Sequence, residues 1–211
     1  MKKKILVTLS VVACALLLVV GSVVGTLAYL TSTTAQVKNT FTAGNVTITL
    51  DEAKVDQYGV ATDATNDRVD GTNSPANTYK LIPGHRYTKD PTIHVGATSE
   101  DCYLFVKVVN GLADALDADT IATQMAANGW TPVADQAGVY QFNGNGETLA
   151  KVAAGTDVVV FEYFKLLGTA DVDAYTSAAI TVQAYAVQAD GFADPAAAWA
   201  AAPPSPQITH A

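Results

Sequence analysis

Apolar and polar residues alternate in short segments along most of this chain. From Val46 to Leu50 every second residue is aliphatic and the residues between are threonines, which predicts a strand with one face on a core and one in water. Six further segments show this alternation or are rich in β-branched and aromatic residues, and most are bounded by Gly, Pro, Asn or Asp. They are Tyr79–Ile82, Thr92–Val95, Cys102–Val109, Val139–Phe142, Val158–Phe164 and Ile180–Gln188. Val158–Phe164 is apolar on both faces, which predicts a central strand. Together the segments predict an all-β fold, an antiparallel jelly-roll-like β-sandwich.

One segment between these strands has helical spacing instead. Within residues 111–129 the apolar positions recur roughly every four residues, at Leu112, Leu116, Ile121 and Met125. Thr120 is a candidate helix start, and Gly129 is a candidate terminator. We expect a short helical insertion that covers one open end of the sandwich, and a partner-binding helix is the alternative.

The N-terminus has a third pattern. Lys2 to Lys4 precede an apolar run from Ile5 to Val24, and small residues follow it, which is typical of an export signal. The run is longer than the usual signal core of about 7–15 residues and approaches the roughly 20 that span a bilayer, so a permanent anchor is the competing interpretation. The small residues of Thr26-Leu27-Ala28 favour cleavage between Ala28 and Tyr29.

These patterns divide the chain into four parts. We expect a signal peptide at 1–28, an extended N-terminal segment at 29–38, a β-sandwich domain at 39–192 and an Ala/Pro-rich tail at 193–211, in which Trp199 anchors a helical turn. The first strand of the domain is expected within Asn39–Leu50. The protein should then be secreted, to the cell surface or an extracellular matrix, and should meet the membrane only through the uncleaved signal.

Charge narrows the choice of partners. Removing 28 of the 211 residues leaves 183 residues with 9 basic and 20 acidic side chains, a formal charge of −11. Nucleic acid is therefore not an expected partner, because its phosphates require a positive surface. The 183 residues retain one cysteine, Cys102, which alternates in phase with Leu104 and Val106. A buried structural thiol is expected there, with a nucleophile or an intermolecular bridge as the alternative.

The sequence offers little catalytic chemistry. A zinc protease signature needs two histidines one helical turn apart with a glutamate between them. His85 follows Pro83-Gly84, His94 lies between the aliphatic residues of a predicted strand, and His210 is in the tail. His85 and His94 could approach one another across a hairpin, but two ligands do not make a catalytic zinc site. A G-x-S-x-G elbow is also missing. We predict no catalytic residues, no metal, no cofactor and no enzymatic activity.

An acidic stretch between Asp63 and Gly71 is a weaker candidate for metal binding. Its oxygen-bearing side chains suit calcium, yet their spacing is not that of an EF-hand loop. A solvated polar loop is the expected structure, and calcium binding stays open.

Several longer motifs resemble one known family. The block N-T-F-T-A-G-N-V-T-I-T-L at Asn39–Leu50, following A-Y-L-T, resembles the TasA/camelysin family, which Gram-positive bacteria secrete through a SipW-type signal peptidase. Further similar segments are L-I-P-G-H-R-Y-T-K-D-P (Leu81–Pro91), D-C-Y-L-F-V-K-V (Asp101–Val108) and V-Q-A-Y-A-V-Q-A-D-G-F (Val182–Phe192). The resemblance implies a protein of biofilm matrix fibres whose partner is itself, with a SipW-type peptidase acting during export and an auxiliary matrix protein as a further candidate.

Signal removal would expose a segment suited to strand addition. It is uncharged, rich in threonine and free of Pro and Gly, and it comprises Tyr29, Leu30, Thr31, Ser32, Thr33, Thr34, Ala35, Gln36 and Val37. An extended segment of this kind can complete the open sheet of a neighbour. The family resemblance makes it a donor strand. A first strand of its own domain, or a disordered leader, is the alternative.

Three functions follow, in order of preference. The first is a structural protein that forms fibres by β-strand addition between subunits. The second is a monomeric surface module that binds a glycan or a protein through outward aromatic residues, with Tyr103, Phe105, Tyr163 and Tyr185 as candidates. The third is a camelysin-like metalloprotease, which lacks recognisable zinc ligands.

Overall fold

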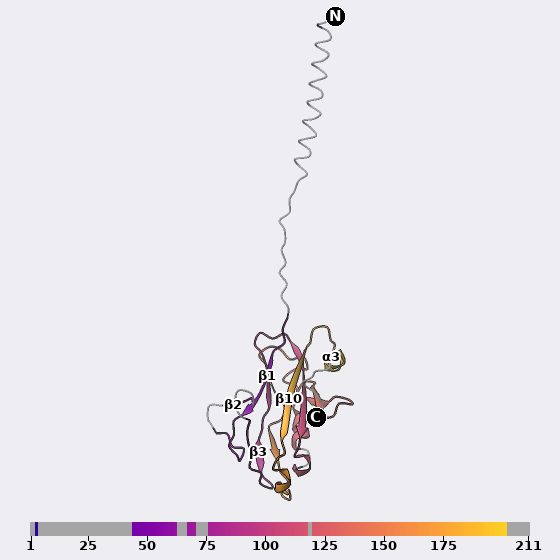
Figure 1. Ribbon diagram of the computed structural model, residues 1–211. Coiled ribbons are helices and arrows are strands. Elements are labelled where there is room, and N and C mark those ends of the chain that lie inside the picture. Colours follow the sequence, from indigo (N-terminus) through magenta and orange to yellow (C-terminus); the bar gives the residue numbers. More distant parts are fainter. Residues whose placement is uncertain (1–2, 4–43, 63–66, 71–75, 118–119, 202–211) are drawn as a thin grey trace. The chain divides into compact units, whose positions relative to one another are not determined.

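Antiparallel strands make up most of the computed structural model, which describes residues 3, 44–62, 67–70, 76–117 and 120–201 (Figure 1). All of these except residue 3 belong to one compact unit, residues 43–211. Two short α-helices accompany the strands in the described residues, so the predicted all-β class is confirmed. None of the described helices is long and apolar enough to cross a membrane.

Two four-stranded sheets form the body of this unit. The first has the order β2-β1-β4-β8, and the second has the order β10-β5-β7-β6. The strands of the first sheet are β1 (Ile48–Ala53), β2 (Arg68–Val69), β4 (Thr92–Val95) and β8 (Asp157–Val159). Those of the second are β5 (Cys102–Asn110), β6 (Trp130–Pro132), β7 (Val139–Phe142) and β10 (Ile180–Gln188). A smaller sheet pairs β3 (Arg86–Thr88) with β9 (Tyr163–Lys165).

The alternating residues of both sheets meet in one core. In β5, Cys102, Leu104 and Val106 point into it, opposite Ile93 and Val95 of β4. The 3-10 helix η1 (Ala113–Ala115) and the helix α2 (Thr120–Ala127) close one part of this core, with two α2 residues, Ile121 and Met125, buried in it. The helical insertion is therefore confirmed, with α2 described from Thr120 onward, and the packing of α2 favours the covering role over the partner-binding one.

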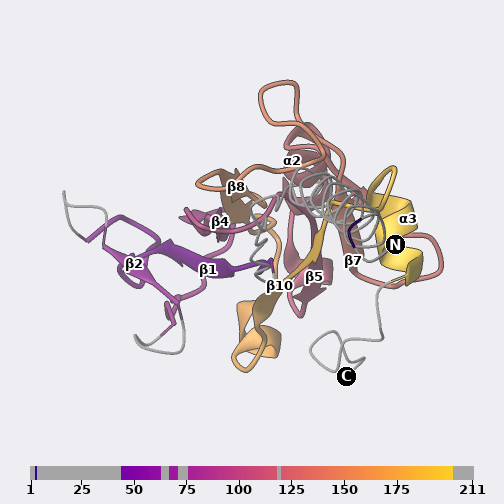
Figure 2. The ribbon, with the colours of Figure 1, turned by 90° about the horizontal axis from the view of Figure 1, so that it is seen from above.

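The opposite face of the second sheet carries a smaller core. The helix α3 (Pro195–Ala201) lies on the outer side of β10, β5 and β7 (Figure 2). Trp199 packs against Phe105 with ring centroids 4.9 Å apart, and Tyr103 is buried beside them. The expected docking of the tail through Trp199 is confirmed as far as Ala201.

Two predicted strands are wrong. Residues 79–82 form no strand, because the buried hydroxyl of Tyr87 takes their backbone hydrogen bonds: it accepts from Ile82 N at 2.7 Å and donates to Lys80 O at 2.6 Å. The segment 158–164 is not one central strand either. It contributes to β8, at the edge of the first sheet, and to β9, in the small sheet, and its buried residues Val158, Val160, Phe161 and Phe164 all lie in the one main core. The first strand begins at Ile48, and of the expected stretch before it, residues 39–43 lie outside the described part.

A glycine after α2 gives a direct test of this packing. Gly129 has φ of +88°, and a Cβ there would lie 2.3 Å from the carbonyl oxygen of Gly144. Gly146 has φ of +90° and open space around it. We expect Gly146→Ala to lower the free energy of unfolding by about 1 kcal/mol, through backbone strain alone. Gly129→Ala should lower it by about 3 kcal/mol or more.

Urea unfolding followed by tryptophan fluorescence measures both variants. Equal losses for the two glycines would mean that the turn at Gly129 does not pack against Gly144 in solution.

Candidate functional site

Strand β10 has a free edge. All nine of its residues pair with β5, and it stands at the end of its sheet. Ala189 N donates to Asp101 O and Gly111 N donates to Ala179 O, so the odd-numbered residues of β10 are the hydrogen-bonded partners of β5. Because hydrogen-bonded pairs alternate along an antiparallel ladder, Val182, Ala184 and Ala186 direct their N–H and C=O groups to the other side. Among the described strands, none pairs with that side.

Strand β1 presents a second free edge. Residues 48–51 pair with β4, whereas β2 pairs only with Glu52 and Ala53. Gly96 N donates to Thr47 O at 2.9 Å, which makes Thr47, Thr49 and Asp51 the hydrogen-bonded partners of β4. Ile48 and Leu50 therefore direct their backbone groups away from β4, where the described residues supply no strand.

The two edges face one another across a groove, which we call the β1–β10 groove. It comprises two adjoining cavities of about 460 and 290 Å³. The first lies between residues 46–50 and residues 182–186, and the second lies between residues 50–52 and residues 180–182. Residue numbers therefore rise along β1 in the direction in which they fall along β10. The two strands run antiparallel on the two sides of the groove.

The groove has a largely apolar floor, and Asp70 lines both of its cavities. Val46, Ile48 and Leu50 from one side, and Val182 and Ala184 from the other, are half-buried and pack against the main core. An extended chain laid here would bury apolar side chains at every second position and offer its backbone groups to both edges. The edges are close together, because some Cα atoms of β1 and β10 lie within 8 Å of each other. A strand between them needs about 9.6 Å, twice the strand spacing, so they must separate by at least about 1.6 Å at these points.

A larger cavity of about 560 Å³ continues the groove beyond Ile180, and we call it the end pocket. It shares Glu52, Ala76, Lys89 and Ile180 with the neighbouring cavity. Its aromatic wall contains Tyr79 and Phe164, whose rings meet edge to face with centroids 5.2 Å apart.

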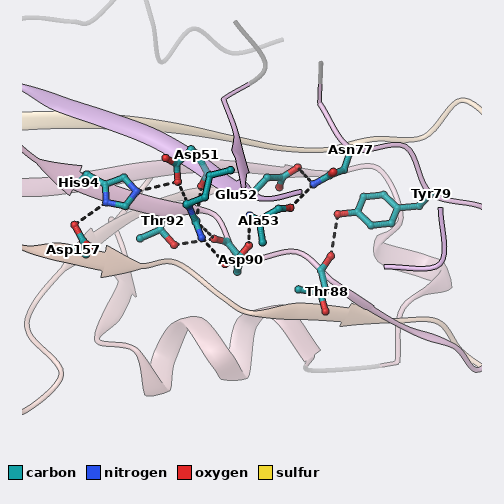
Figure 3. Close-up of polar contacts among 11 residues, drawn as sticks. Asp51, Glu52, Ala53, Asn77, Tyr79, Thr88, Asp90, Thr92, His94 and Asp157 are labelled. Atoms are coloured by element: carbon teal, nitrogen blue, oxygen red, sulfur yellow. Dashed lines mark hydrogen bonds and ion pairs between the residues drawn. The ribbon is translucent and has the colours of Figure 1, made fainter. Parts of the chain in front are cut away.

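The polar wall of the end pocket is an ion pair. Lys89 binds Glu52, and both side chains are almost fully buried. Asn77 Nδ2 donates to Glu52 at 3.0 Å. Burial, and then the charge of Glu52, raise the pKa of Tyr79, so its hydroxyl stays protonated and donates to Thr88 O (Figure 3).

The outer face of the first sheet carries a charged cluster, shown in Figure 3. His94 Nδ1 is 2.7 Å from Asp157 Oδ1, and His94 Nε2 is 2.9 Å from Asp51 Oδ1. Carboxylate oxygens accept, so both ring nitrogens donate and the imidazole is positively charged. Burial opposes this charge, but the hydrogen bonds and charges of the two aspartates outweigh it and raise the pKa of His94. Arg68 adds bonds to Asp51 and to Asp90. The cluster ties β1, β2, β4 and β8 together.

The histidines expected at the surface occupy separate places. His85 Nε2 donates to Tyr58 O at 3.0 Å, whereas the partners of His94 are Asp51 and Asp157. The hairpin considered as a way to bring them together does not form, because β3 pairs with β9 and β4 pairs with β1 and β8. No group of three or more His, Cys, Asp or Glu side chains in the described residues could hold a metal ion.

Other predicted site residues are accounted for individually. Cys102 is fully buried, and burial with the charge of Asp101 raises the pKa of its thiol to about 11, which fits a structural role. The aromatic candidates for ligand binding are engaged within the protein: Tyr103 and Phe105 are buried beneath α3, Tyr185 meets Trp199 edge to face, and Arg86 stacks on Tyr163. Ala28, the segment Tyr29–Val37, His210 and most of the acidic stretch 63–71 lie outside the described residues.

Comparison of the chain with protein-family models, with curated proteins and with solved structures finds no match. The groove therefore has to be interpreted from its own geometry.

The charged cluster predicts a pH dependence of stability. A pKa raised by folding adds stability that is complete below the unfolded value of about 6.5 and is lost as pH rises through the folded value. We expect His94→Gln to be less stable than the wild type at pH 5.5, and the difference to shrink by pH 9. Urea unfolding at both pH values measures this difference.

Asp157→Asn serves as the matched variant, because it removes one of the two carboxylates that accept hydrogen bonds from His94. It should reduce the pH-dependent part of the free energy of unfolding. A wild-type advantage over His94→Gln that does not change with pH would contradict an imidazolium at this place.

Proposed function

We propose that this protein is a secreted structural protein of an extracellular or biofilm matrix, and that it assembles into fibres by β-strand addition between subunits. The observation that carries the proposal is the pair of free strand edges on the two sides of the β1–β10 groove. Unpaired backbone groups at a sheet edge are a template for another chain. Here two such edges flank an apolar floor, so a single extended segment satisfies both.

The segment Tyr29–Val37 is the proposed occupant, supplied by a neighbouring copy. It has nine residues, and β10 offers nine. It is uncharged and contains neither Pro nor Gly, as a buried central strand requires. Cleavage after Ala28 frees its N-terminal end, which would otherwise continue into the apolar signal. Export and assembly are thereby coupled.

The resemblance to the TasA/camelysin family supports the same function. It adds a SipW-type signal peptidase as the enzyme that releases the segment, and a jelly-roll-like β-sandwich as the architecture that accepts it. The proposal needs no catalytic group, and a formal charge of −11 on the cleaved chain favours solubility outside the cell until a specific contact forms.

Filament formation tests the proposal. Purified protein beginning at Tyr29 should form filaments visible by electron microscopy, and protein beginning at Asn39 should remain monomeric, because it lacks the donor segment. Monomers from both forms under all conditions would contradict the proposed function.

A single substitution makes the test specific to the groove. Ala184 directs its N–H into the groove and not to β5, so Ala184→Pro removes a groove donor while the pairing with β5 stays intact. We expect this variant to fold, by circular dichroism, and to lose assembly. Ala184→Val is the matched control, since it keeps the N–H and should assemble.

A further inference from the structure

Resting on the proposed function, we infer that the end pocket is the receptor for an aromatic side chain, that of Phe41 from the neighbouring subunit. This contact lies outside the donor segment Tyr29–Val37. It fixes both the register and the direction of the donor in the β1–β10 groove.

Direction follows from the symmetry of an open fibre. The donor segment precedes β1 in its own chain, so it enters its own domain at the Val46 end. In subunits that repeat head to tail, the donor must leave its acceptor at the opposite end, beside Glu52 and Ile180. It then runs parallel to β1 and antiparallel to β10. The reverse direction would join the Val46 ends of two subunits, and such a reciprocal contact closes a dimer instead of extending a fibre.

Register follows from the alternation of the donor. A strand in the groove directs every second side chain to the apolar floor, so either its odd-numbered or its even-numbered residues face inward. A slip of one residue exchanges the two sets. The odd-numbered set comprises Tyr29, Thr31, Thr33, Ala35, Val37, Asn39 and Phe41, whereas the even-numbered set, which contains Leu30, would place Gln36 and the charged Lys38 on the floor. The odd-numbered residues must therefore face inward. With nine residues opposite nine, Val37 lies opposite Ile180 and Tyr29 lies opposite Gln188.

This register carries Phe41 to the end pocket. Phe41 follows Val37 by four residues, about 13 Å of extended chain, and it shares the inward phase. The end pocket begins at Ile180 and extends over Thr176 and Tyr175, in the direction that the donor takes. Aromatic rings prefer the edge-to-face and offset contacts that the Tyr79 and Phe164 rings can offer. A volume of about 560 Å³ accommodates a phenyl ring together with the chain that carries it.

The buried ion pair of the pocket also fits this occupant. Lys89 and Glu52 satisfy one another, and Asn77 bonds to Glu52. No buried side-chain N or O atom in the described residues is left without a hydrogen bond. An apolar ring can enter such a pocket without leaving a charge unpaired, whereas a charged guest would have to compete with a bond already formed.

Two measurements on protein beginning at Tyr29 test the contact. Phe41→Ala should raise the concentration needed for filament formation at least about tenfold, because an anchoring aromatic side chain is removed from a pocket. Thr40→Ala, one residue earlier and in the outward phase, is the matched control and should change it little. In the second measurement, Phe41→Cys combined with Thr176→Cys should give a ladder of disulfide-linked subunits on oxidation. Tyr29→Cys combined with Thr176→Cys should not.

The outcomes separate this contact from the proposed function. Wild-type filaments together with an unchanged Phe41→Ala threshold, or a ladder from the Tyr29 pair instead of the Phe41 pair, would overturn the contact and leave strand addition standing. A failure of the wild type to form filaments would overturn both. In the disulfide experiment the single-cysteine variants measure background cross-linking. The buried Cys102 should contribute nothing to this background.

Discussion

Backbone N–H and C=O groups at the edge of a sheet need hydrogen-bond partners, and in this domain two such edges face each other over a shared apolar floor. Most of what is distinctive in the structure follows from this arrangement. The two sheets share a core, yet β1 and β10 are joined by no ladder in the described residues. The sandwich is closed by side-chain packing along this seam and not by hydrogen bonds. Strand addition would require this seam to open, and no hydrogen-bond ladder between the described strands crosses it.

The rest of the fold holds those edges in place. On the outer face, the bonds of His94 and Arg68 to Asp51 fix β1 to its neighbours without using its inner edge. On the opposite side, β10 pairs along its whole length with β5, and α3 covers the outer face of both. A strand ladder therefore holds β10 from one side only, and the same is true of residues 48–51 of β1, whereas Glu52 and Ala53 also pair with β2.

The alternation of apolar and polar residues predicted several strands correctly. Thr92–Val95, Val139–Phe142 and Ile180–Gln188 were predicted with the bounds that the structure has, because alternation reports which face is buried. The strand predicted at Tyr79–Ile82 is wrong, because a side-chain hydroxyl, that of Tyr87 a few residues along the chain, takes the place of a strand partner. The short strands β2, β3 and β6 were missed, because two or three residues are too few to show an alternation of apolar and polar positions.

The groove itself could not be predicted from the sequence. It depends on which strands pair, and alternation says nothing about partners. The cluster around His94 was missed for the same reason: Asp51, His94 and Asp157 were each on an outward phase, but only the register of three strands brings them together. The donor segment stays a prediction: its lack of charge, Pro and Gly suits strand addition, and the family resemblance makes it a donor.

Amide hydrogen exchange of β10 tests the central claim most directly, because neighbouring residues of one strand report on opposite edges. In the monomer, the amides of Gln183 and Tyr185 should exchange slowly, as donors to β5, and those of Val182, Ala184 and Ala186 should exchange fast. On assembly of protein beginning at Tyr29, the even-numbered amides should become protected by about a hundredfold or more. Even-numbered amides that stay unprotected in filaments, or that are already protected in the monomer, would contradict strand addition in this groove.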